Sequence, residues 1–205
     1  VQACENVNAS GGTLHLLGLL GDGGVHAHDA HLMALVELAQ QRGVKRVVLH
    51  AMLDGRDTPP QSAMGYLRAA LAKIGDRAQL ASVSGRYYGM DRDNRWERTG
   101  LWYRAAVRSD APVEVDALAA LQRAYDAGTT DEFVLPYVMS GPDGAAIAPM
   151  RDGDALICFN YRSDRMRQTL RALAMPDFTG FDTGARPSLS ITTMTSYDDA
   201  FPFPI

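Results

Sequence analysis

Seven residues in four separate segments are of the types that hold a small, multiply charged anion. The segments are residues 21–28 (GDGGVHAH), 53–60 (LDGRDTPP), 84–96 (SGRYYGMDRDNRW) and 160–165 (NYRSDR). The candidates are one histidine, one carboxylate and five arginines: His26, Arg56, Asp57, Arg86, Arg92, Arg162 and Arg165. A guanidinium offers a planar fork of donors that matches a carboxylate or a phosphate. Guanidiniums held together repel one another unless an anion lies between them, so their convergence would predict an anionic ligand.

An apolar run typical of a buried strand precedes each of the four segments. Predicted strands cover residues 13–20, 44–50, 79–84, 154–159 and 189–194, and predicted helices cover 28–42, 59–74, 91–108, 115–127 and 163–174. This alternation predicts an α/β fold with a mostly parallel sheet, helices on both faces, and a small hairpin excursion at residues 140–144. Such sheets bind ligands outside the carboxyl ends of their strands. The four segments would meet there.

The start of the predicted helix at residues 163–174 adds a reason for an anion. Ser163 is a plausible N-cap, which would put Arg165 in the first helical turn. A cation there opposes the helix dipole by about 0.3–1 kcal/mol. A bound anion would remove the conflict and use the free backbone N–H groups. The predicted ligand is therefore small and carries more than one negative charge.

Simple ion pairing is the alternative explanation for the arginines. Arg162 and Arg165 have Asp164 and Asp152 as possible partners. In the same way, Arg86 and Arg92 have Asp91 and Asp93 nearby in sequence, in a loop that could be fully solvated. Either arrangement would leave no excess of cations for a ligand.

The acidic and histidine residues also have two interpretations each. Asp57 could pair with Arg56, or it could act as a general acid and base if a ligand hydroxyl lies within hydrogen-bond reach. Asp54 is expected to cap a turn through its side chain. His26 and His28 have a spacing that suits a metal, although a neutral, hydrogen-bonded histidine is the usual arrangement in a glycine-rich loop.

Composition excludes several classes of protein. The 205 residues are 46% hydrophobic with a formal net charge of −4, so no basic excess points to nucleic acid. Cys4 and Cys158 show neither metal-ligand spacing nor a disulfide framework, which favours reduced thiols and a cytoplasmic protein. The chain contains no run of 18 apolar residues, so no membrane span is predicted. We expect one domain over residues 1–205, cut from a longer protein, with about 1–12 and 196–205 as linkers.

The motifs GLLGDGGVHAH, LDGRDTPP, SGRYYGMDRDNRW, DEFVLP and NYRSDR, in this order, resemble those of the cofactor-independent (2,3-bisphosphoglycerate-independent) phosphoglycerate mutases. The resemblance extends from about residue 14 to 195 and concerns the inserted substrate-binding domain of that family. One departure is Gly21, which replaces the serine of the usual SDGGVH loop. The resemblance implies a further, phosphatase-type domain that carries a serine nucleophile and two Mn²⁺ ions. This chain has no counterpart of it, and we expect no metal or other cofactor here.

The resemblance also assigns roles to residues. It implies that phosphoglycerate contacts His26, Arg56, Asp57, Arg86, Arg92, Arg162 and Arg165. Asp57 is the implied proton shuttle, and thus the catalytic residue. The expected activity is the interconversion of 3- and 2-phosphoglycerate in glycolysis and gluconeogenesis, with this fragment inactive alone.

Two other functions are left open by the sequence. One is a non-catalytic module that binds small anions and shares the pocket but not the reaction. The other is a free-standing metallohydrolase that would use Asp22, His26, His28 and Asp54.

Overall fold

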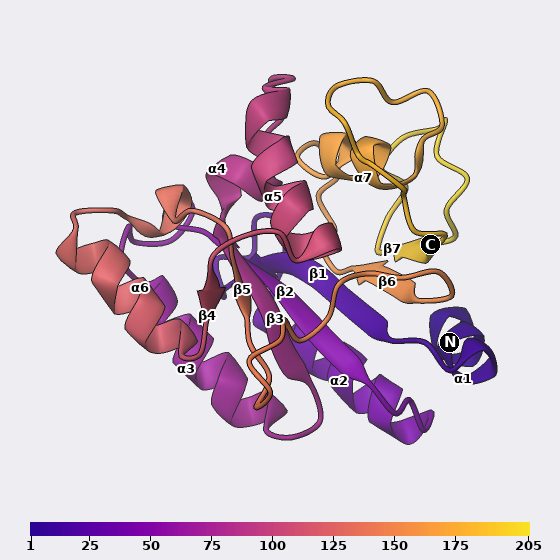
Figure 1. Ribbon diagram of the computed structural model, residues 1–205, viewed down its shortest axis with the longest axis horizontal. Coiled ribbons are helices and arrows are strands. Elements are labelled where there is room, and N and C mark those ends of the chain that lie inside the picture. Colours follow the sequence, from indigo (N-terminus) through magenta and orange to yellow (C-terminus); the bar gives the residue numbers. More distant parts are fainter.

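The computed structural model describes residues 1–205, which form one seven-stranded sheet of order β4-β5-β3-β2-β1-β6-β7 (Figure 1). Five strands run parallel: β1 (Leu14–Leu20), β2 (Val47–Leu53), β3 (Gln79–Gly85), β6 (Ala155–Cys158) and β7 (Ser190–Thr193). The remaining two strands, β4 (Val113–Glu114) at the edge and β5 (Tyr137–Met139) between β4 and β3, run parallel to each other, and β5 pairs antiparallel with β3. The prediction of a mostly parallel α/β sheet is confirmed.

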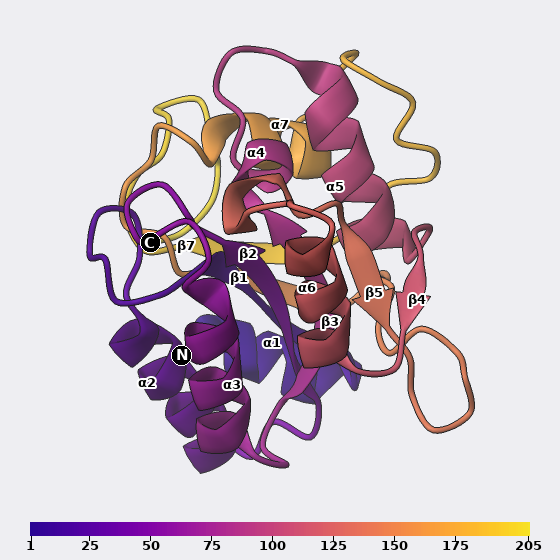
Figure 2. The ribbon, with the colours of Figure 1, turned by 90° about the vertical axis from the view of Figure 1, so that its left-hand side faces the viewer.

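Helices cover both faces of this sheet (Figures 1 and 2). Helices α2 (Asp29–Gln41) and α3 (Ala63–Ile74) lie on one face, with α1 (Gln2–Ser10) near the end of α2 and α6 (Ala117–Asp126) beside α3. Helices α5 (Trp96–Arg108) and α7 (Arg167–Ala174) pack together on the other face. The short α4 (Arg86–Gly89) and the 3-10 helix η1 (Asp131–Phe133) lie at the carboxyl end of β3.

Burial on both faces explains the strand sequences. All seven residues of β1 and all seven of β2 are buried, which is why both read as continuous apolar runs rather than as alternating ones. The predicted excursion is a loop after β5, closed by an antiparallel bridge between Ser140 and Ala146. No helix is both long enough and apolar enough to cross a membrane.

Three helices begin four or five residues later than the sequence predicts, and one of them is α5, which begins at Trp96 rather than at Asp91. Helix α3 begins at Ala63 rather than at the prolines near residue 59, because Asp131 caps it from a distant loop. The Asp131 Oδ2 atom accepts the N–H groups of Ser62 and Ala63, each at 2.9 Å. The expectation that Ser163 is an N-cap and that Arg165 lies in the first helical turn is wrong. Residues 164–166 form a turn, and α7 begins only at Arg167.

Several elements were not predicted or have other bounds. Helix α1 buries Ala3, Cys4 and Val7 and was expected to be a linker sequence, and the two-residue β4 was not predicted. Strand β2 continues to Leu53, so the polar LDGRD segment begins inside the sheet. At the opposite edge, the Thr193 N–H of β7 donates to the Pro204 carbonyl at 3.1 Å.

A buried polar chain crosses four adjacent strands in the sheet interior. The Asp154 carboxylate, just before β6, lies 3.1 Å from His15 Nε2, and His15 Nδ1 lies 2.9 Å from His50 Nε2. His50 Nδ1 in turn lies 2.8 Å from Ser82 Oγ. With Ser82 donating to His50, His50 to His15 and His15 to Asp154, two neutral imidazoles satisfy every polar atom in the chain. None of the four side chains is more than 6% exposed.

Candidate anion-binding site

The four polar segments lie at one end of the sheet, as predicted. Strands β1, β2, β3 and β6 are parallel neighbours, so the loops that follow them open on the same edge. Figure 2 shows the loops after β1 and β2 at the same end of the sheet as α4. We call the seven predicted residues at this end, with the carboxylates that pair with them, the arginine cluster.

Arg86 is the centre of the arginine cluster. It is only 2% exposed, and its Nη1 atom donates to Asp54 Oδ1 and to Asp57 Oδ2, each at 2.6 Å. Although burial lowers the pKa of Arg86, the hydrogen bonds to Asp57 and Asp54 outweigh it and raise the pKa. The alternative of a solvated Arg86 paired with Asp91 or Asp93 is therefore wrong.

Asp54 caps the turn after β2, as its sequence position predicts. Its Oδ1 atom accepts the backbone N–H groups of Arg56 and Asp57 at 3.1 and 3.0 Å. This turn presents the Asp57 carboxylate to Arg86 rather than to its sequence neighbour Arg56. Burial raises the pKa of Asp57, but the hydrogen bond and charge of Arg86 outweigh it, so the pKa lies below its ordinary value.

His26 is a neutral donor. Burial, followed by the charge of Arg86, lowers the pKa of His26 to about 4. Arg86 Nη2 lies 3.0 Å from His26 Nε2, and because a guanidinium can only donate, Nε2 must accept. The ring proton is therefore on Nδ1. The approaches of 3.6 Å to Asp57 and 3.8 Å to Asp164 are not ion pairs at neutral pH.

Arg92 and Arg162 share one carboxylate. Asp164 Oδ2 accepts from Arg92 Nη1 at 2.8 Å and from Arg162 Nη2 at 3.2 Å, and Asp164 Oδ1 lies 3.0 Å from Arg162 Nε. The guanidiniums of Arg92 and Arg162 are about half exposed, so this part of the cluster faces solvent. The alternative of an ion pair with Asp164 is thus correct for Arg162, and Arg92 pairs with Asp164 as well and not with Asp91 or Asp93.

Arg165 has no carboxylate partner within 4.0 Å, unlike the other four arginines of the cluster. Its Nη1 donates to the Met90 carbonyl at 3.1 Å. Burial and then the charges of Arg86, Arg92 and Arg56 lower the pKa of Arg165, which nevertheless stays protonated near neutral pH. Arg165 is thus a half-buried cation among cations.

Glu132 is a member of the cluster that was not among the predicted site residues. Its Oε1 lies 3.4 Å from Nη1 of the exposed Arg56. Two glycines allow this approach. A Cβ on Gly85 would lie 2.2 Å from the Glu132 carbonyl oxygen, and a Cβ on Gly55, at φ +67°, would lie 2.8 Å from Asp131 Cβ. The DEFVLP motif contains Glu132, but nothing local shows that it faces Arg56.

The residues of this chain do not fit a metal centre. No group of three or more His, Cys, Asp or Glu side chains is arranged to hold a metal ion. His28 Nδ1 accepts the N–H of Ala30 as the cap of α2, and Asp22 accepts from the Tyr66 hydroxyl. The metallohydrolase hypothesis therefore has no site here, and the two Mn²⁺ ions that the resemblance implies cannot be placed on these residues.

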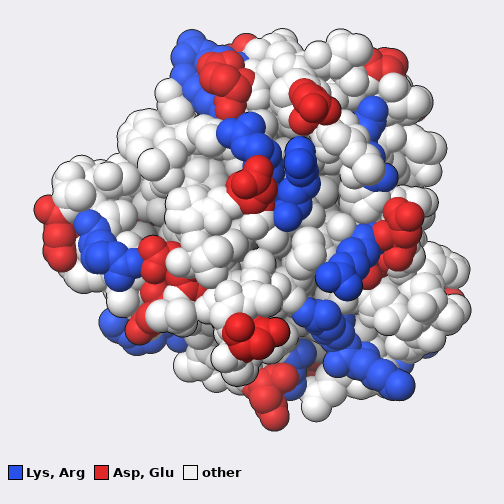
Figure 3. Space-filling model, viewed as in Figure 1, with Lys and Arg blue, Asp and Glu red and all other residues white.

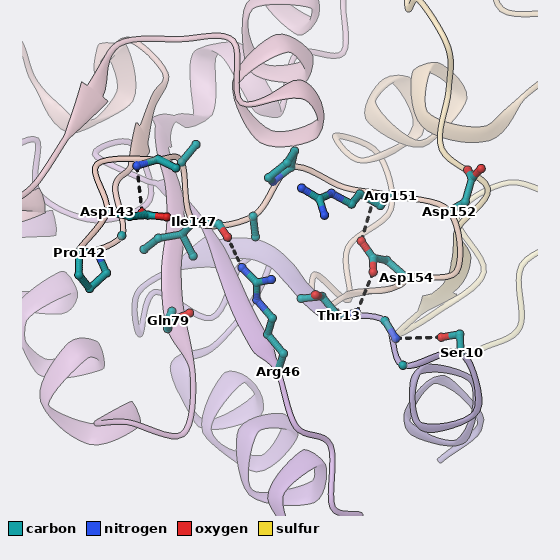
Figure 4. A pocket seen from close by; sticks show the side chains of 17 residues that line it. Ser10, Thr13, Arg46, Gln79, Pro142, Asp143, Ile147, Arg151, Asp152 and Asp154 are labelled. Atoms are coloured by element: carbon teal, nitrogen blue, oxygen red, sulfur yellow. Dashed lines mark hydrogen bonds between the residues drawn. The ribbon is translucent and has the colours of Figure 1, made fainter.

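Two large hollows lie away from the arginine cluster. One of about 750 Å³ lies at the amino ends of the strands, next to Thr13, Arg46 and Asp154 (Figure 4). Its polar groups bond within the protein: Arg46 donates to the Ile147 carbonyl, and Asp154 accepts from Thr13 and Arg151. The other, of about 790 Å³, is mostly apolar and lies between α6 and residues 133–137.

Charges of both signs are mixed on the face drawn in Figure 3. Basic and acidic side chains lie interspersed there, so this face offers no continuous basic field of the kind that a nucleic-acid backbone requires.

Comparison with known proteins identifies the family. The family model described as BPG-independent PGAM N-terminus matches residues 1–199. The chain belongs to this family. It is 45% identical over 204 residues to the 2,3-bisphosphoglycerate-independent phosphoglycerate mutase of Myxococcus xanthus, and 48% identical over 201 residues to that of Symbiobacterium thermophilum. The resemblance found in the sequence is thereby confirmed.

A solved structure shows the same fold. Leishmania mexicana phosphoglycerate mutase, crystallised at low cobalt concentration, superposes with a TM-score of 0.89 at 35% identity. The match covers 96% of this chain but only 38% of that one, and the chain likewise spans 40% and 38% of the two bacterial relatives. The family members thus contain a large region with no counterpart among these 205 residues.

Proposed function

We propose that this chain is the substrate-binding part of a phosphoglycerate mutase that interconverts 3- and 2-phosphoglycerate. The observation that carries the proposal is Arg165. It is a half-buried cation with no carboxylate partner, in a cluster where five arginines face four carboxylates and a neutral histidine. Asp164 offsets only part of the charge repulsion around Arg165, and an added anion would offset more of it. A phosphoglycerate, with a carboxylate and a phosphate, matches several guanidiniums at once.

The chemistry proposed for these residues is retention and proton transfer. The phosphoryl group would leave and return on groups outside this chain, and metal chemistry would likewise be supplied by the remainder of a longer protein. The arginine cluster would hold the glycerate between the two transfers, which supplies effective concentration. Residues of this chain form no bond to phosphorus in this scheme.

Asp57 is the proposed proton shuttle. In the free domain Arg86 keeps it ionised, so it is a weak base. A bound dianion would offset the Arg86 charge and raise the pKa of Asp57 towards the range in which a carboxylate can take a proton. It would then accept a proton from one glycerate hydroxyl and return one to the other. Asp57 is 25% exposed, so a ligand can reach it.

The test is binding of 3-phosphoglycerate to the 205-residue chain, measured by titration calorimetry. We expect weak but measurable binding by the wild type and at least a roughly tenfold loss in Arg165→Ala, since a charge-assisted hydrogen bond is lost. Arg123→Ala is the matched control, because Arg123 is an exposed arginine of α6 paired with Glu114. Equal binding by wild type and Arg165→Ala would reject the site.

A mutase assay separates this proposal from a non-catalytic anion-binding module. The chain alone should turn nothing over, and a full-length protein that contains it should be active. An inactive full-length protein that still binds phosphoglycerate would favour the module.

A further inference from the structure

Asp164 occupies the cluster in the way that a bound carboxylate would. Its Oδ2 atom accepts from Arg162 Nη2 at 3.2 Å and from Arg92 Nη1 at 2.8 Å, and its Oδ1 atom lies in ion-pair contact with Arg162 Nε at 3.0 Å without a hydrogen bond. This is the side-on, multiply donated arrangement by which arginines recognise anionic ligands. Burial raises the pKa of Asp164, but the Arg92 hydrogen bond and the Arg162 charge outweigh it, so the carboxylate is ionised.

The fit of Asp164 is incomplete on the side of His26. His26 Nδ1 and Asp164 Oδ1 are both buried, neither has a hydrogen-bond partner, and they face each other across 3.8 Å. Because Arg86 fixes the ring proton on Nδ1, His26 presents a donor that the carboxylate does not reach. A free oxyanion, which no backbone tethers, can satisfy His26, Arg162 and Arg92 together.

Asp164 is also free to leave. It lies in the turn at residues 164–166, outside both β6 and α7, so rotation of its side chain breaks no bond of a strand or helix. Its side chain is 25% exposed, whereas Asp54, the buried partner of Arg86, is 4% exposed and held at 2.6 Å. Within one cluster, the Asp54 carboxylate is thus buried against its cation, and the Asp164 carboxylate is partly open to solvent.

We propose that Asp164 is an internal surrogate for an anionic ligand group. It neutralises Arg92 and Arg162 in the empty domain, and an oxyanion of the ligand displaces it and takes their donors together with His26 Nδ1. The inference rests on the proposed function and adds a competitor inside the site. Asp164 therefore sets how tightly the cluster binds: it prevents the arginines from repelling one another, and it lowers the affinity for every anion that enters.

The experiment measures binding of inorganic phosphate to the 205-residue chain by titration calorimetry. Removal of the competing charge in Asp164→Asn should tighten binding about threefold to tenfold, the range expected for exchanging a partly exposed ion pair. Asp93→Asn is the matched control. Asp93 is an exposed residue in the same loop as Arg92, and it forms no ion pair itself. Its replacement removes the same charge and should change the phosphate affinity by less than about twofold.

Every outcome of this experiment either supports or overturns the inference about Asp164. Weaker binding by Asp164→Asn would show that Asp164 holds the arginines for the ligand, and equal tightening by Asp93→Asn would reduce the effect to net charge. Either result overturns the inference, as does no change. Thermal unfolding checks that the variant is folded, and Asp164→Ala replaces it if it is not. The two proposals can fail separately. If Asp164→Asn binds phosphate more tightly but Arg165→Ala binds 3-phosphoglycerate as well as the wild type does, the role of Asp164 as a surrogate stands and the proposed function is rejected.

Discussion

The sheet carries two polar networks that are built in opposite ways. The chain of Asp154, His15, His50 and Ser82 lies inside the sheet, is closed to solvent and has a partner for every polar atom. The arginine cluster lies at the carboxyl edge and is open to solvent on the side of Arg92 and Arg162. Of the five buried polar atoms that lack a partner, three belong to it: His26 Nδ1, Arg86 Nε and Asp164 Oδ1.

This contrast separates polar groups that stabilise the fold from polar groups that are available to a ligand. A complete buried network gains from the low dielectric of the interior, whereas an incomplete one is costly. A folded domain keeps an incomplete network where something else completes it. Arg86 and Asp164, which carry two of the three unsatisfied atoms, both act on the charge of the half-buried Arg165. Variants in the two networks should therefore have different effects on stability and on binding.

The largest effect is expected for Arg86→Met. Arg86 is the exception to the contrast, because it both stabilises the fold and belongs to the anion-binding cluster. The variant leaves the buried Asp54 and the partly exposed Asp57 without their cation, and loss of one partner of a buried ion pair costs about 3–5 kcal/mol. Urea unfolding measures the free energy of unfolding, and phosphate binding should be lost as well. Arg123→Met, at an exposed pair, is the control and should have little effect. A fully stable Arg86→Met protein would contradict the central place given to Arg86.

A smaller effect is expected for His50→Leu, which should lower stability without changing phosphate binding. The variant leaves His15 Nδ1 and Ser82 Oγ without their partner, at a cost of about 1–3 kcal/mol. Phosphate affinity should remain that of the wild type, because the chain does not reach the cluster. Arg165→Ala should show the reverse, with weaker binding and no loss of stability. Weaker phosphate binding by His50→Leu would couple the two networks.

A further effect is expected from pH, and it involves both networks. The folded-state pKa of His26 is about 4, and that of the buried His50 also lies well below the ordinary value of 6.5. Between these values the unfolded chain takes up protons that the folded chain does not, so acidification favours unfolding. From pH 6.5 towards 4.5, urea unfolding should report uptake of about two protons on unfolding.

The effect of sulfate on this pH dependence tests whether one of the two protons belongs to His26. A dianion bound beside His26 raises the pKa of that ring, so sulfate should flatten the pH dependence of the wild type but not that of His26→Gln. Sodium chloride at the same ionic strength is the control. An identical response of the two proteins would place His26 outside the anion site.

The sequence predicted what is local and missed what is brought together by folding. Strands β1, β2 and β3 were recognisable because parallel strands buried on both faces are continuous apolar runs. The Asp54 cap could be predicted because the backbone N–H groups that donate to it lie within three residues. The cap that Asp131 places on α3 could not, since it comes from 68 residues away.

The same limit applies to the arginine cluster. The seven site residues were predicted from residue type and from their place after strands, and the structure brings them to one edge. Their pairing was not predictable: Asp57 turns to Arg86 rather than to its neighbour Arg56, and Arg92 reaches Asp164 across 72 residues. Arg165 was singled out for a helix position that it does not have. What distinguishes it is the lack of a carboxylate partner, which only the folded chain shows.

The two edges of the sheet have a consequence for handling the protein at high concentration. Exposed strand edges recruit strands from other molecules and start aggregates. Here β4 is two residues long, and on β7 the Thr193 amide is already occupied by the Pro204 carbonyl. Removal of residues 201–205 would expose that amide, and the shortened chain is the form in which intermolecular strand pairing should appear first.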